Sequence, residues 1–295
     1  MSQDQEEQTN KSFKEKWSNN KDLAFSETLK EDSNIQKWIL RRNGFNSLEE
    51  FKEWLSGRGR ILDAGCGNGR VTALLQANTN STQQIVGIDL SSAEVAAEKL
   101  NSFKNVDVYS KDLLGDLTDL GHFDLIYCQE VLHHTSNPLG AFSNLCKRLN
   151  PGGEIAIYVY KLKAPLREYA DDYIRGLISE LSYEEATKEM SKLTELGKNL
   201  SELNIKLQVP EIKMLDIKKG EYDIQRFIYH FFIKCFWNPD LSVDENTAIN
   251  YDWYHPTIST RHTPEEVKSW FDQNSLEIIH FHEDHYGITA RGKLD

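Results

Sequence analysis

The chain has 295 residues, of which 39% are hydrophobic and 27% charged, and its formal net charge at pH 7 is −12. This length suits one large domain or one domain with a substantial insertion, and the acidic balance disfavours broad, non-specific binding to nucleic acid or to anionic membranes. The sequence shows neither a signal-peptide layout at its start nor an apolar run of roughly 18 residues, and its four scattered cysteines, without a CxxC pair, favour a reducing cytoplasm.

The first residues, up to about position 20, are polar and are expected to be frayed apart from Trp17. From Leu29 to Leu55 apolar residues recur at helical spacing, so residues 1–57 are predicted to form an N-terminal helical extension. The pattern then alternates between strand and helix, with a candidate capping box at Ser91 and Glu94. Helical crossovers between strands predict a parallel sheet covered on both faces. The predicted strands are Arg60–Asp63, Gln84–Asp89, Val106–Ser110, Phe123–Gln129 and Glu154–Tyr160.

The alternation stops after Tyr160, and residues 161–262 are predicted to form a mostly helical insertion with a capping box at Ser182 and Glu185. The aromatic run Phe227–Trp237 is expected to pack this insertion, because Phe227, Phe231 and Cys235 fall at helical spacing. A lipophilic pocket or contact with a membrane surface are the alternatives for this run. Residues 58–160 and 263–295 are predicted to form the core. Its last elements are a helix starting at Thr263-Pro264-Glu265-Glu266 and strands at about Leu276–His282 and Tyr286–Arg291.

The stretch ILDAGCGNGR, Ile61–Arg70, places three glycines directly after a strand that reads as buried. Glycine allows a ligand to sit close to the main chain, and such a loop before a helix suits a nucleotide-like ligand. The spacing Gly65, Gly67, Gly69 differs from the dinucleotide fingerprint G-x-G-x-x-G, and Asp63 replaces the apolar residue usual in dehydrogenases. Asp89 ends the second strand, where a carboxylate can accept hydrogen bonds from both hydroxyls of a ribose.

The pattern hhDxGxGxG resembles motif I of the class I S-adenosylmethionine (SAM)-dependent methyltransferases. The stretches IVGIDLS, VYSKDL and FDLIYCQEVLHH followed by LNPGGEIAIYVY resemble later motifs of that family, in the same order. The resemblance covers residues 58–160 and 263–291. It implies an α/β fold with a Rossmann-like, seven-stranded, mostly parallel sheet flanked by helices. It also implies that the N-terminal helices and the helical insertion after the fifth strand form a lid over the acceptor.

The resemblance implies SAM as the cofactor, with Asp63 and Gly65 near its methionine end, Asp89 at the ribose and Asp112 at the adenine. Simpler roles stay open: the glycines could be turn residues, Asp89 a helix cap and Asp112 a surface residue. A metal is not implied, because the H-x-H-x-x-H pattern of His280, His282 and His285 lacks a complete ligand set. The full set of implied cofactor contacts is Asp63, Gly65, Gly67, Gly69, Asp89, Leu90, Asp112, Leu113 and Gln129.

In this family the loop after the fourth strand borders the transferable methyl group. Here that loop is Gln129–His134, and His133 or His134 could remove a proton from an alcohol or phenol, although either could instead bond the loop. The loop lacks the acidic or asparagine residue followed by Pro-Pro-aromatic that marks amino-methylating members. A candidate substrate wall, or alternatively a packed aromatic hinge, is formed by Tyr254, His255, Arg261 and His262.

These features predict a SAM-dependent methyltransferase that acts on oxygen in a small molecule or in a glycan or lipid intermediate. A tRNA-modifying methyltransferase is the alternative within the same family, so nucleic acid is disfavoured as a partner but not excluded. A nicotinamide-dependent oxidoreductase and a non-catalytic SAM-binding module are alternatives from other classes. The sequence determines neither the acceptor nor the oligomeric state.

Overall fold

The computed structural model describes residues 2–295 and divides the chain into two compact units. The first, which we call the sheet unit, comprises Trp17–Lys161 and Thr260–Asp295. The second, the helical unit, comprises the residues up to Lys16 together with Leu162–Ser259. The predicted lid over an acceptor concerns the relation between the two units and stays a prediction. Within residues 2–295, no helix is both long enough and apolar enough to cross a membrane.

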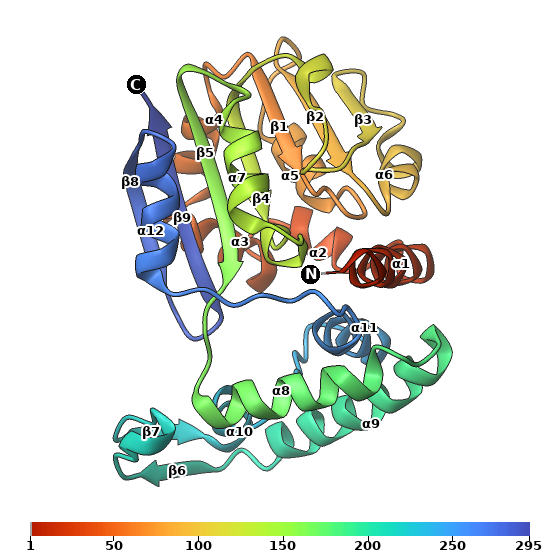
Figure 1. Cartoon of the computed structure of the whole chain (residues 1–295), viewed down its shortest axis with the longest axis vertical. Coiled ribbons are helices and arrows are strands. Elements are labelled where there is room, and N and C mark those ends of the chain that lie inside the picture. The colour runs from red at the N-terminus through yellow and green to blue at the C-terminus, as the bar shows by residue number, and fades with distance from the viewer. Residues whose placement is uncertain (1) are drawn as a thin grey trace. The chain divides into compact units, whose positions relative to one another are not determined.

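The sheet unit is built on a seven-stranded sheet with the order β3-β2-β1-β4-β5-β9-β8 (Figure 1). The first five strands are parallel, and an α-helix connects each to the next as the sequence predicted, except between β3 and β4, where the 3-10 turn Thr118–Leu120 lies. β9 runs antiparallel to β5, and β8 runs antiparallel to β9. This arrangement confirms the predicted seven-stranded, mostly parallel α/β fold. The strands are β1 (Arg60–Ala64), β2 (Gln84–Asp89), β3 (Val106–Ser110), β4 (Phe123–Gln129), β5 (Leu149–Tyr160), β8 (Leu276–Glu283) and β9 (Gly287–Leu294).

Helices cover both faces of this sheet, because its central strands carry apolar side chains on both sides. Ile126, Ile155 and Ile157 pack in one core with residues of α7 and α12, whereas Leu125, Tyr127 and Ala156 pack in another with residues of α3, α4 and α5. The predicted start of α12 is confirmed, since Thr263 caps it and proline follows. The helices are α2 (Phe25–Leu29), α3 (Asn34–Arg42), α4 (Leu48–Leu55), α5 (Arg70–Ala77), α6 (Ala93–Leu100), α7 (Pro138–Cys146) and α12 (Pro264–Gln273).

The helical unit contains α8 (Pro165–Ile178), α9 (Tyr183–Glu202), α10 (Ile224–Phe231) and α11 (Val243–Tyr254). The capping box predicted at Ser182 and Glu185 is present at the start of α9. The sequence missed a two-stranded antiparallel sheet of β6 (Lys206–Val209) and β7 (Gly220–Asp223). The predicted helical spacing through Cys235 is wrong, because α10 ends at Phe231 and Cys235 lies in the following loop. All four cysteines are free thiols with buried side chains.

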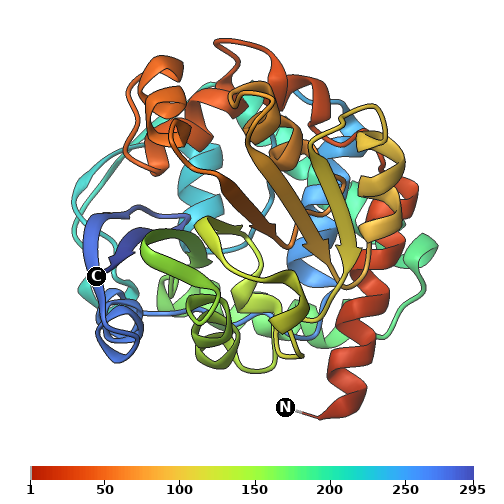
Figure 2. The same cartoon turned by 90° about the horizontal axis from the view of Figure 1, so that it is seen from above.

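The expectation that the first residues are frayed is also wrong, because Gln3–Asn19 forms α1, shown at the red end of the ribbon in Figures 1 and 2. Its polar side chains anchor it within the helical unit. Gln8 donates from Nε2 to the carbonyl of His255 at 2.8 Å, and Lys16 Nζ lies 2.6 Å from an oxygen of Asp252. A helix held by hydrogen bonds and an ion pair has little hydrophobic periodicity, which explains why the sequence pattern missed it.

Candidate functional site

The glycine loop joins the carboxyl end of β1 to α5 and has little space around it. Gly65 and Gly67 adopt positive φ angles of 85° and 58°, which side chains rarely tolerate. A Cβ atom on Gly65 would lie 2.2 Å from Cγ2 of Val131, and one on Gly67 would lie 2.9 Å from the Trp17 ring. The loop therefore needs glycine for its backbone conformation and for close contact with its neighbours. Gly69 is the residue immediately before α5.

Asp89, at the end of β2, braces this loop. Its Oδ2 accepts a hydrogen bond from the backbone N–H of Gly67 at 3.0 Å. Its Oδ1 accepts from the backbone N–H groups of Ser91 and Ser92 at 2.8 and 2.9 Å, and from the Ser92 hydroxyl at 3.0 Å. The carboxylate thus ties the glycine loop to the start of α6. Its role at a ribose stays a prediction.

The capping box predicted at Ser91 and Glu94 is wrong. The residue that caps α6 is Ser92, and its side chain makes no capping bond to the helix. Its hydroxyl instead donates to the carbonyl of Gly67 at 2.9 Å and contacts Asp89. Asp89 accepts from the backbone N–H groups of Ser91 and Ser92 just before α6, and the Ser92 hydroxyl holds the glycine loop from a second side.

Asp63 is buried under the loop, where its Oδ2 accepts a hydrogen bond from Thr72 at 2.6 Å. Burial raises the pKa of its carboxyl to about 7, and the nearby charge of Asp89 adds to the rise, whereas the Thr72 bond opposes it. A buried carboxyl of this kind is poised to ionise when a positive charge comes close.

The predicted adenine residues lie after β3. Asp112 is exposed and accepts a hydrogen bond at Oδ1 from the backbone N–H of Leu114 at 2.9 Å. The side chain of Leu113 is buried in the core, so it can offer a ligand only its backbone, whereas Leu90 is 50% exposed. The adenine contact of Asp112 and the cofactor contacts of the two leucines stay predictions.

The loop after β4 lies against the glycine loop through the contact of Val131 with Gly65. The side chain of Gln129 is buried, its Nε2 donates weakly to Asn43 at 3.4 Å, and its Oε1 has no hydrogen-bond partner among the described residues. Glu130 follows with a positive φ of 66°, which is strained for a residue other than glycine. A buried, unsatisfied acceptor at this position is what a ligand with an N–H donor would complete.

Arg42, at the end of α3, belongs to the same cluster and was missed by the sequence analysis. Arg42 is 3% exposed, and its guanidinium lies against the rings of Trp38 and Tyr158, at 3.9 and 4.5 Å from their centroids. Its Nη1 is 3.6 Å from Oε1 of Glu130, a separation typical of an ion pair but too long for a hydrogen bond. Nε and Nη1 have no hydrogen-bond partner among residues 2–295. Sequence motifs gave no signal for Arg42, because it reaches the site through the packing of α3.

His133 and His134 lie in a 3-10 helix, Leu132–His134, after the strained Glu130. His133 is fully buried, and its ring centroid is 3.6 Å from that of Tyr160. Its backbone carbonyl accepts hydrogen bonds from the N–H and hydroxyl of Thr260. His134 is half-buried, with its ring 5.5 Å from that of Tyr160. Of the two predicted bases, His134 is the one whose side chain solvent can reach.

Of the residues predicted to form a substrate wall, Tyr254 and His255 belong to the helical unit, whereas Arg261 and His262 belong to the sheet unit. The fully buried Tyr254 donates its hydroxyl proton to Asp171 at 2.7 Å, and burial raises the pKa of its phenol well above the usual value.

The rings of His255 and Tyr251 are stacked at 4.5 Å, and both ring nitrogens of His255 have partners, the Ser12 hydroxyl and the Leu181 carbonyl. The side chains of Tyr254 and His255 are both engaged in the interior of the helical unit, which agrees with the alternative of aromatic packing, and their contact with a substrate stays a prediction. His262 is 2.9 Å from both Glu266 and Thr260 through its two ring nitrogens.

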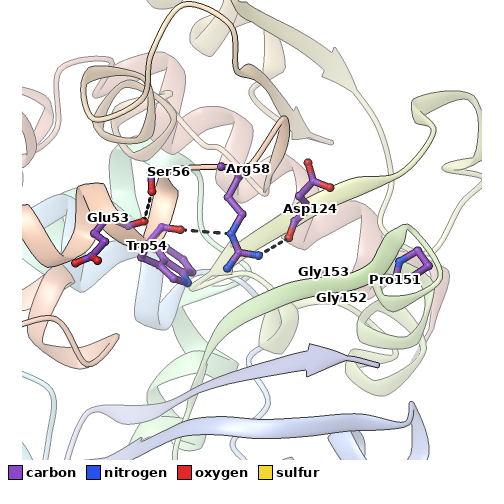
Figure 3. Close-up of a pocket in the computed structure, with 9 residues that line it drawn as sticks. Glu53, Trp54, Ser56, Arg58, Asp124, Pro151, Gly152 and Gly153 are labelled. Atoms are coloured by element: carbon purple, nitrogen blue, oxygen red, sulfur yellow. Dashed lines mark hydrogen bonds between the residues drawn. The ribbon is translucent and has the colours of Figure 1, made fainter.

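Two other features of the sheet unit are the histidines of the last strands and a polar depression. His280 Nε2 is 2.9 Å from the carbonyl of Arg42, and within residues 2–295 no group of three or more His, Cys, Asp or Glu side chains is arranged to hold a metal ion. A polar depression of about 410 Å³ lies at the amino ends of β1 and β4, where Arg58 donates to the carbonyls of Trp54 and Asp124 (Figure 3). Arg58 also donates to the Glu154 carboxylate. Ligands of open α/β sheets bind at the opposite edge, at the carboxyl ends of the strands, where the glycine loop lies.

The strand order, the glycine loop and the acids at the carboxyl ends of β1 and β2 define a doubly wound α/β domain of the nucleotide-binding type. Residues 62–155 match the family model of a methyltransferase domain. The chain therefore contains a class I SAM-dependent methyltransferase domain, as the sequence motifs predicted.

Two relatives match over about a third of this chain. An uncharacterized protein of Synechococcus sp. is 41% identical over 109 residues, which are 35% of this chain and 26% of that protein. A ubiquinone biosynthesis O-methyltransferase of Alkalilimnicola ehrlichii is 32% identical over 105 residues, which are 34% of this chain and 41% of that protein. The chain thus matches less than half of either relative.

Among solved structures, an O-methyltransferase family protein from Burkholderia thailandensis has a TM-score of 0.48 and 11% identity. The alignment covers 88% of this chain and 57% of that chain. A likeness at that level carries no argument about function.

Proposed function

We propose that this protein is a SAM-dependent methyltransferase that methylates oxygen in a small molecule or in a glycan or lipid intermediate, and that it acts in the cytoplasm. The observation that carries the proposal is the tight glycine loop, held by Asp89 and Ser92 within a methyltransferase domain. The relative named as a ubiquinone biosynthesis O-methyltransferase supports oxygen as the methylated atom. The buried free thiols agree with a reducing compartment.

The residues at the site fit SAM by charge and by hydrogen bonding. SAM when bound would supply a methyl group on a positively charged sulfur. The carboxyls of Asp63 and Asp89 favour the cationic end of such a ligand, and the backbone of the glycine loop offers a surface without side chains. What this chain does for the reaction is then to align the acceptor oxygen, to exclude water and to accept the acceptor's proton.

The glycine loop provides the direct test of this function. In Gly67→Val, the added side chain meets the Trp17 ring and fills the approach to the loop, so SAM binding measured by calorimetry should be lost. Gly152→Val is the matched control, because Gly152 also has a positive φ but no atom lies within 4 Å of the place that a Cβ would take. Unchanged SAM affinity in a folded Gly67→Val protein, or wild-type binding of NADH rather than SAM, would overturn the assignment.

Arg42 has donors and Gln129 has an acceptor without hydrogen-bond partners in the part of the chain that the structure describes, and these suit the carboxylate and the ammonium at the amino-acid end of SAM. We infer that the Arg42 guanidinium binds the carboxylate of the cofactor and that Oε1 of Gln129 accepts a hydrogen bond from its ammonium. Arg42→Met should weaken SAM and S-adenosylhomocysteine roughly 10- to 100-fold, which is the loss of a charged hydrogen-bond pair. It should leave the affinity for 5′-methylthioadenosine unchanged, because that ligand lacks the amino-acid group.

The control for this experiment is Arg41→Met, since Arg41 is the exposed neighbour on the same helix. If wild type and Arg42→Met bind SAM equally well, Arg42 does not bind the cofactor. The proposed function would then still stand. An equal loss for SAM and for 5′-methylthioadenosine would show that the variant damages the whole site instead.

The raised pKa of Asp63 predicts that SAM affinity depends on pH. With a pKa of about 7, the carboxyl is mostly protonated near pH 6 and mostly ionised near pH 8. A bound cation favours the ionised form, so the SAM affinity should rise about tenfold from about pH 6 to about pH 8. Asp63→Asn should flatten this dependence. Without ligand, the folded protein holds the Asp63 proton more tightly than the unfolded chain does. The free energy of unfolding therefore falls as pH rises toward the folded pKa of about 7. Asp63→Asn should consequently unfold at a higher temperature than wild type at about pH 8.

A further inference from the structure

Helix α8 of the helical unit buries charged side chains and exposes apolar ones, which is the reverse of an ordinary surface helix. Its charged residues Arg167, Asp171 and Arg175 are buried. Its exposed face carries a line of large apolar side chains, which we call the α8 stripe. The α8 stripe consists of Leu166, Tyr169, Tyr173 and Leu177, which are 36%, 73%, 63% and 56% exposed. Their spacing of three, four and four residues places them on one side of the helix.

The buried charged face fixes this orientation. Asp171 Oδ2 lies 2.6 Å from Nε of Arg167, and the same carboxylate accepts hydrogen bonds from Trp253 Nε1 and the Tyr254 hydroxyl. Arg175 donates from Nη2 to the carbonyl of Trp253 at 2.9 Å. Turning α8 to bury its apolar side would leave these buried charges without partners, which costs about 3–5 kcal/mol for a single broken pair. The packing of the helical unit therefore leaves the α8 stripe exposed on that unit.

We infer that the α8 stripe is the contact through which two copies of this chain associate, with the two α8 helices antiparallel. The stripe is close to symmetric, because Leu166 and Leu177 are centred between positions 171 and 172 and Tyr169 and Tyr173 are centred on position 171. In an antiparallel pair centred between positions 171 and 172, Leu166 of one copy lies level with Leu177 of the other, and Tyr169 lies one residue, about 1.5 Å along the helix axis, from the level of Tyr173. A two-fold interface requires one patch to be complementary to itself, and this spacing meets that requirement to within one residue.

The charges at the ends of α8 agree with this arrangement. Lys163 precedes the helix and Glu180 follows it. The two residues are equally distant in sequence from the point between positions 171 and 172. Antiparallel pairing brings the lysine end of each copy toward the glutamate end of the other. Asp172, near the centre, is already paired with Arg175 at 3.4 Å. A chain with a net charge of −12 is poorly suited to an anionic membrane, which disfavours that alternative cover for the stripe.

The size of the stripe sets the expected strength. An aromatic side chain buries on the order of 150–250 Å², so the two tyrosines supply about 300–500 Å², and together with two partly exposed leucines they cover only part of the roughly 800 Å² per partner of a standard interface. The α8 pair should therefore form a dimer with a dissociation constant in the micromolar range. This inference does not depend on the proposed catalytic function.

The test is sedimentation velocity over about 1 to 200 μM protein. Wild type should dimerise in this range. The double variant Tyr169→Lys/Tyr173→Lys, which sets lysines against each other, should be monomeric, and so should Tyr169→Glu/Tyr173→Glu. An equimolar mixture of the two variants should dimerise again, because opposite charges then face each other. Met214→Lys is the control, since Met214 is 82% exposed in the loop between β6 and β7 of the same unit, and it should dimerise like wild type.

Circular dichroism should show the same helix content in all variants, because the substituted side chains are exposed. Monomeric wild type at about 200 μM would overturn the inference, and so would double variants that still dimerise alone. Monomeric wild type that floats with phosphatidylcholine vesicles, while both double variants do not, would assign the α8 stripe to a lipid surface instead. Failure of the mixture to dimerise would show that the tyrosines do not face each other.

Discussion

Replacing Asp89 by alanine is expected to weaken SAM binding at least a hundredfold and to lower the free energy of unfolding by about 3 kcal/mol. The carboxylate accepts hydrogen bonds from Gly67, Ser91 and Ser92, so its removal frees both the glycine loop and the start of α6. Calorimetric titration with SAM and thermal unfolding measure the two effects. Asp116→Ala is the matched control, because that exposed aspartate caps only its own turn at Thr118.

A ligand without one ribose hydroxyl separates bracing of the loop from direct contact with the cofactor. If Asp89 binds the ribose, the 2′-deoxy analogue of S-adenosylhomocysteine should bind wild type more weakly than the parent compound. The same change of ligand should make no difference in Asp89→Ala. An equal loss of affinity for the 2′-deoxy analogue in wild type and in Asp89→Ala would show that Asp89 only braces the glycine loop and does not bind the ribose.

His134→Ala is expected to lower the methyl-transfer rate roughly 100- to 10,000-fold, which is the usual contribution of a general base. The prediction holds for an acceptor whose hydroxyl is un-ionised at the pH of the assay. SAM affinity should barely change, because the cofactor residues lie elsewhere in the site. The wild-type rate should fall on the acid side of its pH profile as the base becomes protonated. The measurement is a pH–rate profile with SAM labelled at the methyl group.

His133→Ala should behave differently. Its fully buried ring packs on Tyr160, so its loss should leave a cavity and lower the free energy of unfolding by about 2 kcal/mol. His122→Ala is the control for both variants, because His122 is exposed at the amino end of β4. A near-normal rate in both His133→Ala and His134→Ala would remove the two histidines from the mechanism.

The strands of the sheet could be predicted because each is marked by a pattern within a few consecutive residues. β2 and β4 are short apolar runs that end at polar residues, which is how strands buried on both faces read in a sequence. The glycine loop could be predicted for the same reason, since Asp63 and the three glycines lie within seven consecutive positions. The prediction placed these residues at the carboxyl end of β1, where the structure has them.

The features that the sequence missed depend on contacts between distant segments. Arg42 joins the loop after β4 only because α3 packs beside Tyr158, and a lone arginine at the end of a helix gives no signal of that contact. Helix α1 is polar and is held by side chains of residues far along the chain. Tyr254 and His255 read as a polar aromatic wall, yet Asp171 and Ser12 take up their polar atoms inside the helical unit.

The four buried cysteines allow local unfolding of each unit to be measured by thiol labelling of the native chain. Cys66, Cys128 and Cys146 belong to the sheet unit, and Cys235 belongs to the helical unit. Burial raises the pKa of all four thiols, so alkylation of the folded protein is slow and must await exposure of the sulfur. The labelling rate of Cys235 therefore follows the opening of the helical unit, while the rates of the other three follow the sheet unit. One native chain, without an introduced probe, thus reports the stability of each unit separately.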